Sequence, residues 1–283
     1  MESAIMVSKS ADSRTEKMKA IYSEALKFLN EIAPENVQSD GLEKYFDASK
    51  DFKDKNRILH VMLGSLQSQQ RSPKVIAFWK REPVFKEILF DYDCCRILTA
   101  YNAESLLEKF CDSFNVSMDS VESRHSLWRK YAKSVMSACE FLNSFNDAND
   151  FDEFVSQFAY NECSAAALPM LIEREVFGMG FALACDFLKG LGYTEYPKPD
   201  VHVMDMFSAF GLCDRKAYNA YKAVIEMARA VNETPYKVDT IFWLIGSGEF
   251  YRQGIRIGSN KAKFIDRYAL LCQCDDSNQQ SSC

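Results

Sequence analysis

The chain has 283 residues, which is enough for one domain with a sizeable core or for two interlocked subdomains. Hydrophobic residues make up 47% and charged residues 26%, as in ordinary soluble globular proteins. The net charge of −6 argues against a protein that binds polyanions over its whole surface.

Nothing in the sequence is typical of a membrane or secreted protein. It contains no signal peptide and no run of about 18 or more apolar residues. The ten cysteines are scattered, and several lie inside apolar runs, where a free cysteine acts as a small hydrophobe. We therefore expect a reduced, cytoplasmic protein.

Positive charge is concentrated in two stretches. Residues 71–86 and residues 252–267 each hold five Lys or Arg against a single acidic residue, so each has a net charge of +4. The pattern fits a basic face on an acidic protein, and it equally fits two solvated helix faces.

Apolar residues recur at helical spacing along most of the chain, and no segment alternates with the period of a strand. The sequence therefore predicts an all-α fold. The expected segments in chain order are a disordered 1–13, helices over 13–32, 57–66, 95–111, 123–146, 214–231, 234–245 and 261–272, and a loose tail over 276–283. Helix starts are indicated by the capping signals Ser72-Pro73, Asp150 with Glu153, Asp214, and Thr234-Pro235.

The most informative stretch spans 168–212. Two apolar helical runs are joined by G-M-G at 178–180, and a third begins after P-D-V-H at 199–202. Gly178 can end the first helix, because glycine adopts the left-handed conformation at a helix C-terminus. The turn predicts a helical hairpin whose second helix begins with N–H groups suited to an anion such as a phosphate. Asp200 occupies the N-cap position of the third helix.

These motifs resemble those of the helix-hairpin-helix DNA glycosylases, the HhH-GPD superfamily. The likeness rests on G-M-G, on P-D-V-H with 20 residues from Gly180 to Asp200, and on S-Q-Q-R-S at 68–72 in a polar interhelix loop. It implies a helical barrel over 52–190 that ends in the hairpin. It also implies a second helical subdomain built from 14–51 with 191–275.

The resemblance implies a role for each motif, with a DNA duplex that contains a damaged or modified base as the partner of a monomeric enzyme. The hairpin would hold the DNA backbone, where family members also bind a monovalent cation, K⁺ or Na⁺. Gln70, with Gln69 next in line, would fill the gap left by the flipped nucleotide; the alternative is a plain interhelix turn. The implied DNA-binding residues are Gly178, Met179, Gly180, Gln69, Gln70, Arg71 and Lys198.

Asp200 is the catalytic residue that the resemblance implies. Cleavage of an N-glycosidic bond builds positive charge on the sugar, which a nearby carboxylate stabilises. Asp205 is a rival carboxylate, but five residues turn a helix by about 140° relative to Asp200, and the motif selects Asp200. The alternative for Asp200 is a plain N-cap.

Two features of many relatives are missing. Bifunctional members carry a nucleophilic lysine two residues after the second hairpin glycine, and this chain has Ala182 there, while Lys189 and Lys198 do not match the position. Cys272, Cys274 and Cys283 are too few and wrongly spaced for the four-cysteine iron–sulfur cluster of some members. We therefore expect a monofunctional glycosylase with water as the nucleophile and no cluster.

Two other functions fit the same residues. One is a defence glycosylase that excises the hypermodified bases of phage DNA, and the other is a non-catalytic helix-hairpin-helix module that binds DNA or a protein partner. The target base stays open among alkylated purines, oxidised purines and modified pyrimidines.

Overall fold

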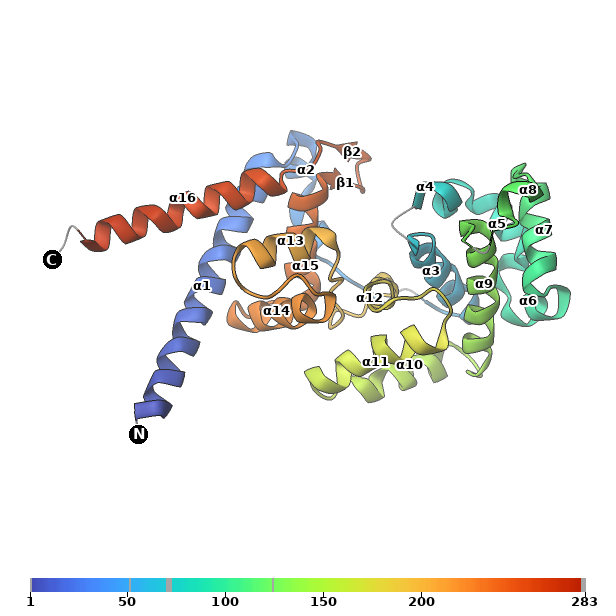
Figure 1. The fold of residues 1–283 in the computed structure, drawn as a ribbon, viewed down its shortest axis with the longest axis horizontal. Helices are drawn as coiled ribbons and strands as arrows, with labels where there is room; N and C mark the ends of the chain where they lie inside the picture. The colour runs from blue at the N-terminus through green and yellow to red at the C-terminus, as the bar shows by residue number, and fades with distance from the viewer. Residues whose placement is uncertain (1, 51, 70–72, 124, 281–283) are drawn as a thin grey trace. The chain divides into compact units, whose positions relative to one another are not determined.

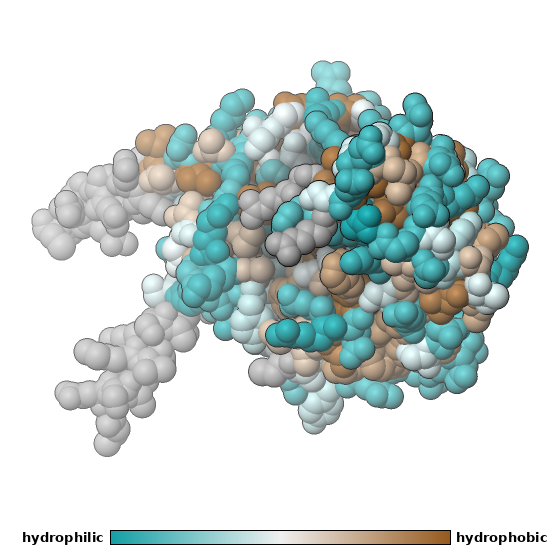
Figure 2. Space-filling view, turned by 45° about the vertical axis from the view of Figure 1, so that its right-hand side comes forward, coloured by the Kyte–Doolittle hydropathy of each residue, from teal (hydrophilic) through white to brown (hydrophobic). Residues whose placement is uncertain are grey.

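The structure is a computed structural model that describes residues 2–50, 52–69, 73–123 and 125–280; the side chains of 2–12, 39–40, 162–163 and 271–280 are not described. The fold is all-α, as the sequence predicted, apart from one pair of two-residue strands (Figure 1). None of the described helices combines the length and apolar composition that crossing a bilayer requires. On the face drawn in Figure 2, hydrophilic side chains predominate, and apolar ones form small groups among them.

The chain divides into two compact units, which are described separately. The first, here called the hairpin unit, is Ser49–Tyr193, and the second, the terminal unit, combines Met1–Ala48 with Thr194–Cys283.

The hairpin unit consists of helices and short 3₁₀ turns. α9 packs against α3, α6 and α7, and α12 packs against α3 and α11, so α3 and α9 form its centre. Its elements are α3 (Lys55–Leu66), α4 (Pro73–Ile76), η3 (Phe78–Lys80), α5 (Glu82–Ile88), η4 (Phe90–Tyr92), α6 (Cys94–Ala100), α7 (Ala103–Phe114), α8 (Met118–Val121), α9 (Leu127–Asn143), α10 (Ala148–Phe158), α11 (Glu162–Glu175) and α12 (Phe181–Gly190).

The start of α10 differs from the sequence prediction. Asp147, not Asp150, is the N-cap, because its side chain accepts from the N–H groups of Asn149 and Asp150. The Asp150 carboxylate instead accepts from the backbone and side chain of Asn146. Both aspartates satisfy the capping pattern in sequence, and the extended backbone of Asp147 decides between them.

The terminal unit surrounds one hydrophobic core. α15 packs against α1, α13 and α14, and its apolar side chains join those of α1 and α13 in that core. Its elements are α1 (Glu2–Ile32), α2 (Glu35–Asp40), η1 (Leu42–Tyr45), α13 (Val201–Ala209), α14 (Ala217–Ala230), α15 (Pro235–Ser247), β1 (Glu249–Phe250), β2 (Ile255–Arg256) and α16 (Lys261–Gln280).

Four features of the terminal unit correct the sequence predictions. α1 begins at Glu2, so residues 2–13 of the stretch expected to be disordered are helical, and no proline interrupts the helix before Pro34. α16 reaches Gln280, within the tail expected to be loose. β1 and β2 pair antiparallel, in a segment too short to show strand periodicity. α14 begins after Lys216 rather than at Asp214, whose carboxylate accepts from the Asn219 side chain.

Candidate functional site

The hairpin turn has the geometry that its glycines predicted. α11 ends at Glu175, and the Val176 N–H still donates to the Ile172 carbonyl at 2.9 Å. Gly178 has a φ of +80°, in the region that favours glycine. Gly180 is extended, with φ −80° and ψ 164°, and it is the N-cap of α12. The turn therefore reverses the chain within five residues and begins a new helix.

Two serine side chains of α9 lie against this turn. The Ser137 hydroxyl donates to the Glu175 carbonyl at 3.1 Å and accepts from the Phe177 N–H at 2.9 Å. A Cβ on Gly178 would lie 2.7 Å from both the Ser134 Oγ and the Gln69 Oε1. Gly178 is therefore required both for its backbone conformation and for the close approach of these side chains.

Gln69 supports the turn from inside, which differs from its expected place in the DNA interface. Its side chain is only 8% exposed, and its Nε2 donates to the Ser134 Oγ at 2.7 Å. Ser134 in turn donates to the Lys130 carbonyl. A DNA contact needs a side chain that faces solvent, and the polar run in the sequence did not reveal which glutamine turns inward. Gln70 and Arg71 lie outside the described residues.

The outer side of the turn is open. No described atom lies within 4 Å of a Cβ built on Gly180, and the Phe177 ring is 48% exposed. Met179 is buried, so its side chain anchors the turn while its backbone remains part of the loop. Because first-turn N–H groups have no acceptor within their own helix, α12 begins with donors beside this open side.

The P-D-V-H segment places Asp200 as an N-cap, as predicted. Its Oδ1 accepts from the backbone N–H groups of His202 and Val203 at 2.8 and 3.0 Å. Within the described part of the chain, no hydrogen bond or ion pair is made by its Oδ2, and the residue is half-buried. One carboxylate oxygen therefore fixes the side chain, and the other remains available.

Asp205, the rival carboxylate, is committed to ion pairs. Its Oδ1 accepts from Arg215 and its Oδ2 from Lys261, at the start of α16. Burial opposes its ionisation, but the hydrogen bonds from Lys261 and Arg215 outweigh that effect and lower the pKa of Asp205. Both oxygens are occupied, so the structure favours Asp200 over Asp205.

Ala182 is the second residue of α12, directly after the open side of the turn. Lys189 lies in the last turn of the same helix, seven residues further on, which is about 10 Å along the axis. The position that carries an amine in bifunctional relatives therefore carries a methyl group here.

The positive charge of 252–267 is largely paired. Arg256 pairs with Glu249, Lys261 with Asp205, and Arg267 with Glu24 and Glu31. Only the part from Lys261 on is helical, so the run is neither the single solvated helix face of the plainer interpretation nor an unpaired basic face. Tyr251, at the tip between β1 and β2, was not predicted from the sequence; it is 52% exposed and packs edge-on against Trp243. Alternating apolar and polar residues would have predicted the two strands and the turn between them, but each strand has only two residues, too few to show alternation.

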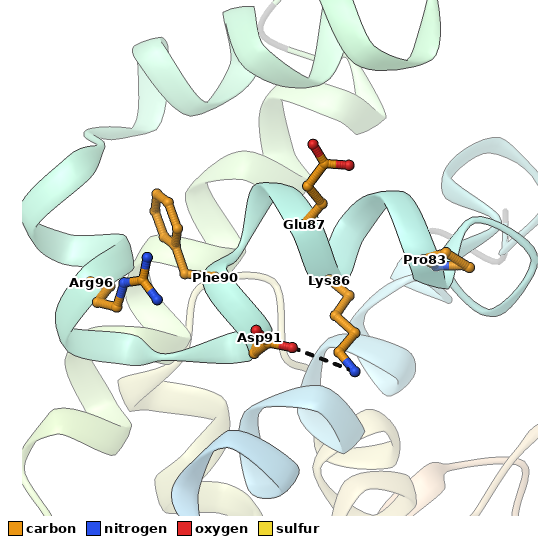
Figure 3. A pocket seen from close by; sticks show the side chains of 6 residues that line it. All are labelled: Pro83, Lys86, Glu87, Phe90, Asp91 and Arg96. Carbon is orange, nitrogen blue, oxygen red and sulfur yellow. Dashed lines mark ion pairs between the residues drawn. The ribbon is translucent and has the colours of Figure 1, made fainter.

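A pocket of about 360 Å³ lies in the hairpin unit, between α5 and α6 (Figure 3). Its charged side chains are two positive and two negative, and Lys86 pairs with Asp91 at 3.4 Å. It is lined by Pro83, Lys86, Glu87, Phe90, Asp91 and Arg96. Of these, only Lys86 had been noted in the sequence, as part of the 71–86 basic stretch, and no net charge remains to select a ligand.

Comparisons with known proteins identify two solved structures with a similar fold. The structure of an 8-oxoguanine DNA glycosylase from Methanocaldococcus jannaschii matches with a TM-score of 0.50 at 18% identity, covering 79% of this chain and 95% of that one. The same organism's 8-oxoguanine glycosylase/lyase in complex with a 15mer DNA containing 8-oxoguanine matches with a TM-score of 0.51 at 16% identity, covering 81% and 98%. The fold is therefore that of the helix-hairpin-helix (HhH-GPD) DNA glycosylases, as the two motifs predicted.

A relative found by sequence is also named for 8-oxoguanine. A curated protein of Korarchaeum cryptofilum, named 8-oxoguanine DNA glycosylase/AP lyase, is 22% identical over an alignment of 185 positions, which covers 59% of this chain and 82% of that protein. No protein-family model matches the chain.

Proposed function

We propose that this protein is a DNA glycosylase that flips a damaged base out of duplex DNA and hydrolyses its N-glycosidic bond. The observation that carries the proposal is the Asp200 carboxylate, with one oxygen fixed by two backbone N–H groups and the other available, in a chain with the glycosylase fold. A carboxylate held so rigidly can stabilise positive charge on the sugar without reorganising during the reaction.

The turn at 176–180 supplies the backbone contact in this proposal. A base within a duplex is unreachable, and flipping it costs a few kcal/mol, so the enzyme must hold the backbone next to the target. The N–H groups at the start of α12 suit a phosphate oxygen, and the open space beside Gly180 admits it. Carbonyl oxygens of the turn are the ligand type that K⁺ takes, so a monovalent cation there stays a prediction.

Oxidised purines are the first substrate class to test, because the relatives are named for 8-oxoguanine. The direct experiment incubates the protein with matched duplexes containing 8-oxoguanine, an alkylated purine, a modified pyrimidine or no lesion, and measures abasic sites. Phage genomic DNA with hypermodified bases belongs in the same set and tests the defence alternative. Duplex binding with no base release from any substrate would instead favour the non-catalytic module.

We further propose that the enzyme leaves an intact abasic site. Schiff-base chemistry requires an amine at the sugar, and the matching position holds Ala182. The Korarchaeum relative is named glycosylase/AP lyase, so the two chains should differ in this step. Borohydride trapping on a cleavable duplex should give no covalent adduct, and strand breaks should appear only after alkali. An adduct that disappears in Lys189→Ala or Lys198→Ala would show that this lysine is the Schiff-base nucleophile.

The remaining expectations are proposals of the same kind. The protein acts as a monomer on duplex DNA and needs no iron–sulfur cluster. The side chains of Cys272 and Cys274 are not described, and Cys283 lies outside the described residues. Iron analysis of the purified protein, together with light scattering, tests both statements.

A further inference from the structure

Asp239 is the least expected side chain of α15. It lies in a run of buried residues, and its own side chain is 0% exposed. Its buried neighbours along the helix are apolar except for Thr240. A buried carboxylate costs free energy unless it is hydrogen-bonded. Asp239 therefore needs a hydrogen-bond donor in this core.

One partner is the segment that leads to Asp200. Asp239 Oδ2 accepts from the backbone N–H of Lys198 at 2.7 Å. The Lys198 carbonyl in turn accepts from the Asp200 N–H at 2.8 Å. Lys198 is therefore held on both sides, and only Pro199, whose φ is fixed by its ring, separates it from Asp200.

Two further contacts tie α15 to the same part of the chain. The Tyr236 N–H, in the first turn of α15, donates to the Thr194 carbonyl at 3.0 Å. At the other end of α15, a Cβ on Gly246 would lie 2.4 Å from the His202 Cβ. α15 therefore contacts the chain before Asp200 and the first turn of the helix after it.

We propose that Asp239 is a positioning residue for Asp200, acting through the Lys198 backbone; this rests on the function proposed above. Because Asp239 is 0% exposed, its carboxylate is not accessible to a bound sugar or base. It fixes the path of Lys198 and Pro199, so that Asp200 enters α13 at one position. Displacing a reacting group by about 1 Å can cost about 10²-fold in rate, which sets the scale of the expected effect.

The test compares three variants in single-turnover excision and in affinity for a duplex with an uncleavable target nucleotide. Asp239→Leu keeps the branched shape of the side chain, with larger methyl groups in place of the oxygens, but leaves the Lys198 N–H without its acceptor. It should slow excision by about 10- to 100-fold with an unchanged Kd. Asp239→Asn keeps an acceptor oxygen and should restore most of the rate. Thr240→Val, at the adjacent buried position, is the matched control and should match the wild type.

Each outcome decides the proposal. An Asp239→Leu protein with the wild-type rate overturns it, and so does an Asp239→Asn protein as slow as Asp239→Leu, because the charge rather than the hydrogen bond would then matter. A wild type that excises nothing refutes the proposed function instead.

A measurement on the wild type alone covers the case in which Asp239→Leu fails to fold. Amide hydrogen exchange should show the Lys198 N–H strongly protected, unlike that of Glu195, an exposed residue of the same loop. Equal exchange at the two positions overturns the proposal whether or not any duplex is cleaved.

Discussion

The turn at 176–180 and the segment at 196–203 solve opposite problems of positioning. The turn presents backbone groups, and its shape follows from a left-handed glycine with two serines beneath it. The second segment presents one side chain, Asp200, and contacts from residues 39 to 46 positions later in the chain hold it in place. The conformation of the turn thus starts from its own glycine, although Ser137 supports it from 38 to 40 positions earlier in the chain. The segment that carries the carboxylate we propose as catalytic is positioned by distant residues.

The largest expected effect comes from the side-chain region. Asp200→Asn should lower excision by about 10³-fold, the scale for removing one electrostatic contribution to a transition state. Folding should survive, because asparagine caps a helix as well as aspartate does. Single-turnover excision and thermal unfolding measure the two effects. Asp205→Asn, on the same helix, is the matched control, and equal losses in both variants would refute the special role of Asp200.

The backbone region should respond in affinity rather than in chemistry. Gly180→Val introduces a side chain where no described atom lies within 4 Å, at a φ of −80° that any residue adopts, so the free protein should fold normally. The side chain would displace a bound phosphate, and losing one hydrogen bond to a charged group weakens binding by about tenfold. Titration of damaged and undamaged duplexes should show the same loss for both. A loss confined to the damaged duplex would place Gly180 in the base pocket.

A substitution at Gly178 should affect the folding of the turn, whereas one at Gly180 should affect DNA binding. Gly178→Ala requires a positive φ and brings its Cβ to 2.7 Å from Gln69 and Ser134, so it should destabilise the hairpin unit by about 1–3 kcal/mol. Urea unfolding of this variant beside Gly180→Val measures the difference. If the two variants unfold together, the buried contacts do not define the turn.

The smallest effect concerns Asp205. Its pKa is lowered in the folded state, so its ion pairs stabilise the protein fully above the unfolded pKa of about 4. This contribution is lost as the pH falls from there through the lower pKa of the folded state. Asp205→Asn should therefore cost about 1 kcal/mol or less at pH 7 and should flatten the loss of stability below pH 4. A wild-type pH dependence in the variant would show that the pairs with Lys261 and Arg215 contribute nothing.

The features that the sequence predicted correctly depend on residues close to one another in the chain. Helical periodicity gave the all-α class, Gly178 the turn, and Asp200 and Thr234 the caps of their helices. It could not predict which of two competing aspartates caps α10, or that Gln69 turns inward, because both depend on tertiary contacts. It also overlooked Asp239, whose partner lies 41 residues away and is a backbone group without any side-chain signature.

The two roles of Asp200, the observed helix cap and the proposed catalytic carboxylate, have a consequence for how the protein can evolve. Active-site residues often reduce stability, so losing them is a route to a more stable protein. Asp200 instead contributes to the fold through its cap, worth about 1 kcal/mol on replacement by alanine. Mutational drift away from aspartate at this position is therefore opposed twice, by the loss of activity and by the loss of stability. Asparagine is the substitution that keeps the helix cap. Replacing the Asp200 carboxylate by an amide would therefore convert the proposed enzyme into an equally stable binding protein.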